Sequence, residues 1–584
     1  MAHYPDSDKL SRRSILRMLP GLAVFARPGR DRFANQAAQQ ASAKPDSRSS
    51  TIRFEEVAAR SNLHFVTRNH PTPNKNQIET MVAGVALLDF DGDGLLDVFL
   101  VNGAEIPSLE KSSPEYWNRL FHNDGNGTFT DVTAKAGVAG IGYGMGVAVA
   151  DYDNDGRPDI FVANVTRNQL LHNNGDGTFT DVTAKAGLGG ALHNGRKMWS
   201  VGAGWFDYNN DGLLDLFVVN YCVWEVNKDP FCALQEGLRA YCHPKYYSPL
   251  HNALYRNNGD GTFTDVSHET GLDLFFGKGM SVSFADYDGD GYLDAFVAND
   301  TTPNFLFHNL GGKRFEEVGV GAGVAYSPDG NALSGMGSDF RDLNNDGLPD
   351  VWHTAVEHET FPLYLNAGKG QFVDATATSG LAQLTNRMSG WGNGIFDFDN
   401  DGWKDLFVAR SNVMDNIHEL VASREYPERN SLFRNLGNGK FEEVGEQAGP
   451  DFLIASPHRG VAFGDIDNDG RIDIVVTQLG GNVKLFHNET VNHGHWILIK
   501  LVGTRSNRMG LGAQIRITAE DGATQWNHVT TAVGYACSSD SRVHFGLGNN
   551  RMIRELEVLW PSRTRQTLHN VEVDRVLTIE EPRG

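Results

Sequence analysis

The sequence predicts an all-β protein in which a seven-bladed β-propeller is followed by a β-sandwich-like domain. Two phrases support the propeller, because a nine-residue acidic pattern and the phrase F-x-[DE]-[VA] each occur seven times. Repeat units of this length, built from four short strands, stack as blades around an axis. After residue 488 the repeats stop and short strand patterns follow, which predicts a second β domain over 491–584.

The first segment, residues 1–43, has the composition of an export signal. It holds the basic phrase SRRSILR, then the apolar stretch MLPGLAVFA and a run of small residues. Arg12 and Arg13 match the pair of the bacterial twin-arginine signal, which this segment resembles, although Ile15 replaces its aromatic residue. The alternative is a disordered basic leader. We expect residues 44–50 to be a linker and the mature protein to be periplasmic or extracellular.

Composition limits the partners of this chain. With 584 residues, 40% of them hydrophobic, the chain is long enough to bury a large core. Its net charge of -22 argues against a nucleic-acid partner, which would require a basic face. No apolar run after the leader approaches the roughly 18 residues of a membrane span. We therefore expect no nucleic acid, no membrane span, and cations as natural ligands.

The acidic pattern has the form D-x-[DN]-x-D-G-x-x-D, and its copies start 55 to 79 residues apart. Each copy leads into an apolar run such as DIFVAN, then into a second run ending in a phrase such as LFHN. A turn such as NDGNG and the phrase FTDV follow, so each unit is expected to be a small antiparallel sheet. The chain begins with such a phrase at Phe54 and its last unit lacks one. The two ends are expected to complete one blade of a propeller spanning 51–490.

The chemistry of the acidic loops predicts calcium binding. Oxygens at positions 1, 3, 5 and 9 and the carbonyl at position 7 can converge on one hard cation, and the glycine at position 6 allows the sharp turn. Calcium accepts six to eight oxygens in a flexible shell, and no histidine or cysteine lies within the pattern. The predicted ligands of up to seven sites are Asp89, Asp91, Asp93, Leu95 and Asp97; Asp151, Asp153, Asp155, Arg157 and Asp159; Asp207, Asn209, Asp211, Leu213 and Asp215; Asp286, Asp288, Asp290, Tyr292 and Asp294; Asp342, Asn344, Asp346, Leu348 and Asp350; Asp397, Asp399, Asp401, Trp403 and Asp405; and Asp465, Asp467, Asp469, Arg471 and Asp473.

Two other interpretations of these loops were weighed. An EF-hand needs glutamate at position 12, where this chain has Leu100, His353 or a valine. The aspartates could also form turns without metal, since aspartate and asparagine favour turns. Seven copies favour metal, because three or four uncompensated carboxylates repel one another by about 1 to 4 kcal/mol per pair. We interpret as strand-end residues the histidines that share one blade position, His122, His172, His308 and His487, because other blades have Arg256, Leu365 and Arg434 there.

The C-terminal region is expected to form seven short strands. Its strand-like phrases are HWILIKLVG, GAQIRITAE, TQWNHVTTA, RVHFGLG, RELEVLWP, RQTLHNV and DRVLTIEE. The alternation of charged and apolar residues over 555–559 is typical of a sheet with one solvated face.

Several longer phrases resemble known families. The loops followed by [LIAV]-F-V are similar to the FG-GAP or VCBS repeats of integrin α-subunit propellers. GMGVAVADYDNDGRPDIFVAN, FVANDTTPNFLFHN, SGWGNGIFDFDNDGWKDLFVAR, VHFGLG and LEVLWPS together resemble the ASPIC/UnbV, or cartilage acidic protein-like, family over about 51–584. The resemblance implies a calcium-stabilised extracellular scaffold with poorly defined partners.

An insertion at about 221–250 lies in the longest gap between acidic loops. In an exported chain its Cys232 and Cys242 are expected to form a disulfide, as in similar insertions of the family. Cys222 and Cys537 are expected to be buried and unreactive. A zinc site formed by the three clustered cysteines and His243 is an alternative without the usual CxxC spacing.

Three functions follow from these observations. The preferred one is an exported calcium-binding scaffold for adhesion or ligand binding, with an extracellular or envelope protein or a glycan as partner. The second is a polysaccharide lyase or hydrolase with a site among His193, Arg196, Lys197 and the insertion, although loops supply such groups in any case. The third is a structural component of the envelope.

Overall fold

The structure is a computed structural model that describes residues 52–190, 192–193, 195–491 and 493–583. The predicted export signal and the linker after it lie outside the described residues. Among the described residues, no helix is long and apolar enough to cross a membrane.

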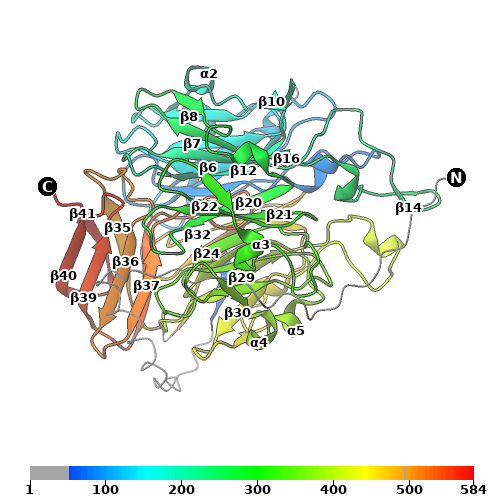
Figure 1. Cartoon of the computed structure of the whole chain (residues 1–584). Coiled ribbons are helices and arrows are strands. Elements are labelled where there is room, and N and C mark those ends of the chain that lie inside the picture. The colour runs from blue at the N-terminus through cyan, green and yellow to red at the C-terminus, as the bar shows by residue number, and fades with distance from the viewer. Residues whose placement is uncertain (1–51, 191, 194, 492, 584) are drawn as a thin grey trace, which may run out of the picture. The chain divides into compact units, whose positions relative to one another are not determined.

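Seven four-stranded antiparallel sheets, here called blades 1 to 7, make up the first part of the described chain (Figure 1). Blade 1 contains β2 (Val85–Leu88), β3 (Asp97–Leu100), β4 (Arg119–Asn123) and β5 (Phe129–Asp131), and blade 2 contains β6 (Gly144–Ala150), β7 (Asp159–Asn164), β8 (Gln169–Asn173) and β9 (Phe179–Asp181). Blade 3 contains β12 (Ser200–Phe206), β13 (Asp215–Asn220), β17 (Ala253–Asn257) and β18 (Phe263–Asp265), and blade 4 contains β20 (Gly279–Ala285), β21 (Asp294–Asn299), β22 (Phe305–Asn309) and β23 (Phe315–Glu317). Blade 5 contains β24 (Ser338–Arg341), β25 (Asp350–His353), β26 (Leu363–Asn366) and β27 (Phe372–Asp374), and blade 6 contains β28 (Gly390–Phe396), β29 (Asp405–Arg410), β30 (Ser431–Asn435) and β31 (Phe441–Glu443). Blade 7 contains β32 (His458–Gly464), β33 (Asp473–Gln478), β34 (Lys484–Asn488) and β1 (Phe54–Glu56).

The blades form a closed ring. The innermost strands contact one another in the cycle β2, β6, β12, β20, β24, β28, β32 and back to β2. Strand β1 pairs with β34, with Phe54 opposite Asn488, so the two ends of this region share one sheet. Closure through the first strand leaves the ring without an open seam. The predictions of an all-β propeller and of the shared blade are confirmed.

The two inner strands of each blade are buried on both faces, which explains their nearly continuous apolar sequences. Strand β7, for example, is buried along its whole length. Neighbouring blades pack through aromatic side chains, as where the rings of Phe206 and Phe284 stack 4.3 Å apart. Helices are short and lie in connections: α1 (Thr133–Ala136), α2 (Thr183–Ala186), α3 (Gly319–Ala322), α4 (Thr376–Ser379), α5 (Leu381–Thr385) and the 3-10 turns η2 (Gln77–Thr80), η3 (Pro114–Tyr116), η4 (Pro244–Tyr246), η5 (Leu272–Leu274), η6 (Ile417–Glu419) and η7 (Asp451–Leu453).

The insertion of blade 3 lies between β13 and β17. It holds the hairpin β14 (Ala233–Gln235) and β15 (Leu238–Arg239), while β16 (Leu250–His251) pairs with β19 (Phe276–Gly277) just before blade 4. A second hairpin, β10 (Leu192–His193) with β11 (Arg196–Lys197), precedes blade 3.

Two further sheets form the C-terminal domain, as predicted. One has the order β38-β35-β41 and the other β37-β36-β39-β40, with β35 and β41 running parallel. The strands are β35 (His495–Val502), β36 (Gln514–Ala519), β37 (Thr524–His528), β38 (Val543–Gly548), β39 (Met552–Leu559), β40 (Arg565–Glu572) and β41 (Arg575–Glu580). In Figure 1 these strands and β14 of the insertion lie on opposite sides of the blades.

The predicted strand TQWNHVTTA is shorter than expected, because the chain leaves the C-terminal sheets after β37. Residues Thr530–Asp540, here called the channel segment, enter the ring of innermost strands, and every residue over 531–539 is buried. Ser538 N–H donates to the carbonyl of Val85 (3.0 Å), and the carbonyl of Ala536 accepts from Val147 N–H (3.0 Å). The C-terminal domain therefore fills the centre of the propeller.

Glycines in the innermost strands make room for the channel segment. A Cβ added at Gly146 would lie 2.8 Å from Cβ of Ala536, and one at Gly460 would lie 2.6 Å from Sγ of Cys537. Both separations are shorter than real Cβ contacts. The glycine-rich runs that precede the acidic loops thus have a packing reason in addition to their strand conformation.

Candidate functional site

The seven acidic loops, here called the aspartate loops, join the first and second strands of every blade. Each loop begins directly after the innermost strand, and its position-9 aspartate is the first residue of the next strand, as Asp97 is in β3. All seven loops consequently lie at one end of the ring. The insertion of blade 3 leaves the other end of β13, so it lies at the opposite end.

Three carboxylates fold each loop through the same backbone hydrogen bonds. In blade 2, Asp151 accepts from Gly156 N–H (2.8 Å), Asp155 accepts from Arg157 N–H (2.9 Å), and Asp159 accepts from Tyr152 N–H (3.3 Å). The equivalent bonds occur in the other six loops at 2.8 to 3.3 Å. Gly156 has a φ of +92°, a left-handed conformation that favours glycine. The turn-forming role of the aspartates is therefore part of the structure.

The position-9 aspartate also connects the loop to the third strand of its blade. One of its oxygens accepts the backbone N–H of the asparagine that ends that strand, at 2.8 Å in every blade. The side chain of the same asparagine donates to the position-2 carbonyl of the preceding blade, as Asn173 does to Phe90 (2.8 Å). These side-chain bonds recur in all seven blades and link them around the ring.

The loops concentrate negative charge in partly buried places. Burial, together with the neighbouring carboxylates, raises the pKa of Asp151 to about 7 and that of Asp465 to about 8. Oxygens of Asp89, Asp91 and Asp97 lie within 4.8 Å of one another. An all-oxygen donor set of this density fits a hard divalent cation such as calcium, which would compensate the charge.

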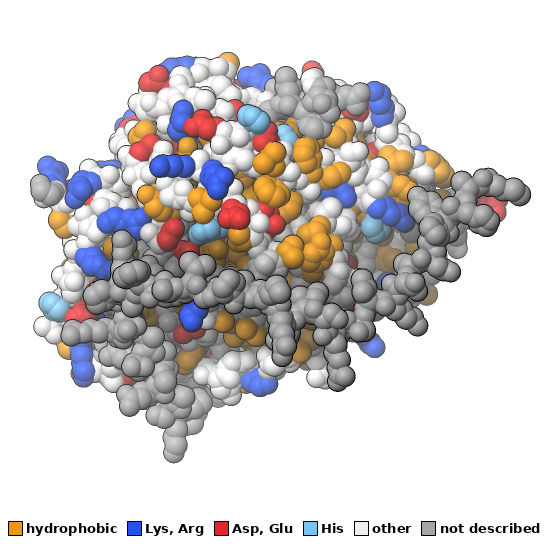
Figure 2. All heavy atoms as spheres, viewed as in Figure 1, with side chains coloured by type: hydrophobic (Ala, Val, Ile, Leu, Met, Phe, Trp, Pro, Cys, Tyr) orange, Lys and Arg blue, Asp and Glu red, His pale blue; other side chains and the backbone are white. Residues whose placement is uncertain are grey.

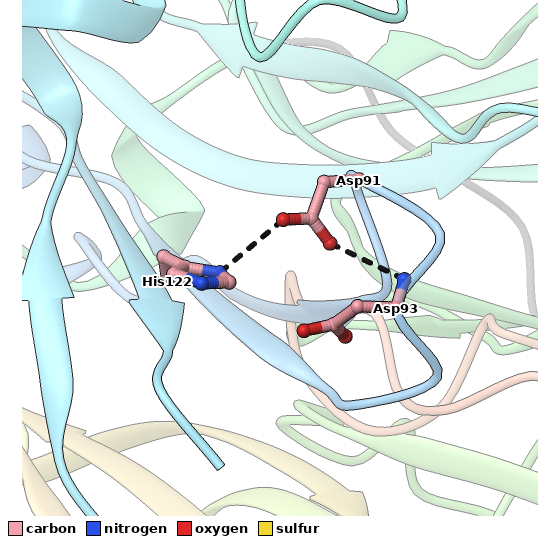
Figure 3. A group of neighbouring side chains, drawn as sticks. All are labelled: Asp91, Asp93 and His122. Atoms are coloured by element: carbon pink, nitrogen blue, oxygen red, sulfur yellow. Dashed lines mark hydrogen bonds and ion pairs between the residues drawn. The ribbon is translucent and has the colours of Figure 1, made fainter.

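The four histidines lie next to the end of the third strand of their blades, as expected, but the sequence did not reveal that their rings turn into the aspartate loops. In each of these four blades, Nδ1 of the histidine lies 2.9 to 3.2 Å from the position-9 carboxylate. The histidines are His122, His172, His308 and His487. Figure 3 shows His122 directed at Asp91, 3.5 Å away. The hydrogen bond with its position-9 aspartate raises the pKa of His487 to about 9. The shared phrase [LF]-H-N was the sequence signal, since it places histidine one residue before the anchoring asparagine.

The C-terminal domain packs against the aspartate loops, while some of their carboxylates, such as Asp91 and Asp93, stay exposed. Its contacts reach loops of five blades: Lys500 Nζ with Asp89 (3.6 Å), Arg508 N–H with Asn154 (2.7 Å), Gln514 Nε2 with Asp286 (3.2 Å), Gly548 N–H with the Asn400 carbonyl (2.8 Å) and Arg542 Nη1 with Asn468 (2.6 Å). This end of the ring is therefore an internal interface.

The insertion combines a rigid base with exposed aromatic residues. Cys232 and Cys242 form a disulfide with their Cα atoms 5.3 Å apart. Asp229 accepts from Trp224 Nε1 (2.8 Å) and from the Tyr247 hydroxyl (2.7 Å), which ties the segment down. Phe231 and Tyr246, in contrast, are exposed. In Figure 2 apolar side chains gather on the surface over β16 and its neighbours.

The other two cysteines are buried, and the candidate catalytic residues lie in a hairpin whose side chains the structure does not describe. Cys222 and Cys537 are buried, and burial raises the pKa of the Cys537 thiol to about 12. The proposed zinc site loses two of its cysteines to the disulfide. His193, Arg196 and Lys197 lie in the β10–β11 hairpin, and their side chains are outside the described part of the structure.

Two families match this chain. The FG-GAP-like repeat matches residues 89–162, 151–218, 246–297, 286–353, 342–408 and 414–476, and the ASPIC and UnbV family matches residues 503–584.

Curated relatives cover most of the chain. Cartilage acidic protein 1 of Homo sapiens is 25% identical over 523 residues, which span 86% of this chain and 72% of that protein. Its Mus musculus counterpart is 25% identical over 521 residues, spanning 85% and 74%. Among solved structures, an Agrocybe aegerita lectin that recognises non-reducing terminal N-acetylglucosamine is 17% identical, covering 69% of this chain and 87% of that chain with a TM-score of 0.37.

Proposed function

This chain belongs to the family of FG-GAP-repeat proteins with a C-terminal ASPIC and UnbV domain, and on that premise we propose that it is an exported, calcium-binding propeller scaffold. Its aspartate loops hold calcium, and its insertion end binds a protein or glycan partner outside the cytoplasm. The observation that carries the calcium assignment is the clustering of loop carboxylates, as where oxygens of Asp89, Asp91 and Asp97 lie within 4.8 Å of one another.

Calcium completes the loops chemically. The carboxylates of positions 1, 5 and 9 already hold backbone N–H groups, and each carboxylate keeps further lone pairs for a metal. The position-3 side chain and the position-7 carbonyl add oxygens from the same turn. A bound ion would offset the burial and the carboxylate repulsion that together raise the pKa of Asp151, and it would strengthen the loop on which blade and C-terminal domain meet.

We assign the partner site to the insertion end because other parts of the chain occupy the opposite end and the centre of the ring. The C-terminal domain occupies the aspartate-loop end and the channel segment occupies the centre. The insertion end keeps exposed aromatic side chains, including Phe231, which is 70% exposed. Exposed aromatic residues on a rigid base are a common feature of binding surfaces for proteins and sugars.

Calorimetry of the chelator-treated protein with calcium tests the metal assignment. We expect several ions to bind and the melting temperature to rise, since a ligand of the native state stabilises it by RT ln(1 + [L]/Kd), about 2.7 kcal/mol per site at 100 Kd. Unchanged melting in excess EGTA would refute the calcium role. A glycan and protein array tests the partner: binding by the wild type should be lost in Phe231→Ala with Tyr246→Ala, and equal binding by that variant would refute the insertion site.

A further inference from the structure

One aspartate loop differs from the other six in the residue that reaches into it. Arg434, on the third strand of blade 6, holds the blade position that histidine holds in blades 1, 2, 4 and 7. Its Nε donates to Oδ2 of Asp399 at 2.8 Å and its Nη2 donates to Oδ2 of Asp401 at 2.9 Å. These are the carboxylates of positions 3 and 5. The guanidinium thus joins two of the side chains that the metal would need.

The arginine lies inside the loop. The Asp399 side chain is fully buried and that of Arg434 is only 20% exposed. Both contacts have the length of charge-assisted hydrogen bonds, and the forked guanidinium suits two carboxylates at once. Because arginine stays protonated in proteins, its charge is permanent at this place.

A second buried cation supports the same loop. Lys404 occupies position 8, is buried, and donates from Nζ to the Trp526 carbonyl of the C-terminal domain (3.1 Å). It lies close enough to Asp342 and Asp397 to interact with both electrostatically. The loop therefore has a guanidinium bonded to Asp399 and Asp401 and a lysine close to Asp397.

We infer that Arg434 serves as the built-in cation of loop 397–405 and that this loop takes no calcium, while the other loops do. The inference rests on the proposed calcium function. Calcium needs its oxygens at 2.3 to 2.6 Å, and the guanidinium already occupies the space between the oxygens of positions 3 and 5. Placing a divalent ion there would also bring it against a permanent positive charge.

Arg256 of blade 3 provides a natural comparison. It holds the same blade position, but it pairs with Glu269 (3.7 Å) and its side chain contacts Tyr208, at position 2 of loop 207–215. Position 3 of that loop is Asn209, so the loop lacks the carboxylate that Arg434 contacts in blade 6. The arginines at position 7, Arg157 and Arg471, pair with the position-5 carboxylate of their own loops. Bridging of positions 3 and 5 is thus the feature that distinguishes Arg434 among the described arginines of the loops.

The experiment counts bound calcium by native mass spectrometry and calorimetry after chelator treatment. Arg434→Leu, which copies blade 5, and Arg434→His, which copies blades 1, 2, 4 and 7, should each bind one more calcium ion than the wild type. The matched control Arg256→Leu should bind the same number as the wild type. A larger calcium-induced rise in melting temperature for Arg434→Leu than for Arg256→Leu is also expected.

The possible results separate the inference from the function beneath it. If the wild type binds calcium and neither variant of Arg434 binds an additional ion, the inference is wrong and the calcium function stands. If no variant binds calcium, both are wrong. The use of two different replacements keeps the test informative should one of them fold poorly.

Discussion

Replacing Tyr535 by alanine tests whether the channel segment is held in the propeller by packing. The Tyr535 side chain is fully buried, its hydroxyl donates to the Met81 carbonyl (2.8 Å), and its ring lies 5.3 Å from that of Trp391. Truncation of a buried aromatic side chain to alanine costs about 3 to 5 kcal/mol. Tyr535→Phe keeps the ring and removes one hydrogen bond, so it should cost about 1 to 2 kcal/mol.

Cys537 gives the assay its local readout, because it lies in the channel segment and its side chain is buried. In a Cys222→Ser background, a thiol reagent should modify Cys537 only after the segment leaves the ring. If the loss of 3 to 5 kcal/mol lowers the free energy needed for the segment to leave the ring, the thiol reagent should modify Cys537 roughly 10² to 10³-fold faster or more. Urea unfolding measured in parallel gives the global stability.

The exposed Leu274 supplies a control, since Leu274→Ala should change stability by less than about 0.5 kcal/mol and leave Cys537 protected. Unfolding free energy and Cys537 reactivity that stay at wild-type values in Tyr535→Ala would contradict the packing of the segment described above.

Three further predictions concern the ring, the domain interface and the insertion. Asn173→Ala should lower the free energy of unfolding by about 2 to 4 kcal/mol, because it removes a buried inter-blade hydrogen bond; urea unfolding within 0.5 kcal/mol of the wild type would contradict this. Burial lowers the pKa of His528 to about 3 and that of His544 to about 4. Below about pH 6.5 the unfolded chain therefore takes up protons that the folded chain does not. As the pH falls, each histidine should reduce the free energy of unfolding by up to about 1.4 kcal/mol per pH unit until its folded pKa is reached. Replacing both histidines by glutamine should make the free energy of unfolding depend less on pH between pH 6 and pH 4 in saturating calcium. A slope identical to that of the wild type would contradict the assignment of this dependence to the two histidines. Mass spectrometry of the unreduced protein should find Cys232 joined to Cys242, and reduction should cost about 2 to 3 kcal/mol; a free Cys232 thiol would disprove the bond.

The repeats made most of the fold predictable. Each blade reuses one pattern of strand, acidic loop, strand and turn, so errors in one copy were corrected by the other six. The shared blade could be deduced because the repeat region begins at Phe54 with a strand that the last unit lacks, and β1 pairs with β34 as expected. The strands after residue 491 were predictable for a different reason, because polar and apolar residues alternate clearly along them.

Side-chain direction was not visible in the pattern. His122 and Arg434 share a blade position, but the contacts that each makes with its loop depend on side chains far from it in sequence, such as Asp399 at position 3 of blade 6. The sequence distance of about 30 residues between loop and strand hid this contact. The same limit applies to Arg256, which pairs with Glu269 and not with a loop carboxylate of position 3, although its type and position are those of Arg434.

What the sequence determined by itself was the local chemistry of this protein: oxygen-rich turns at a fixed spacing, strands apolar on both faces, and a separate β domain after them. These features depend on neighbours along the chain, so periodicity and turn preference reveal them. The tertiary structure alone decided that the C-terminal domain packs against the aspartate loops and sends residues 530–540 into the ring. That outcome depends on shape complementarity between segments hundreds of residues apart, such as Gly146 and Ala536, which no local pattern encodes.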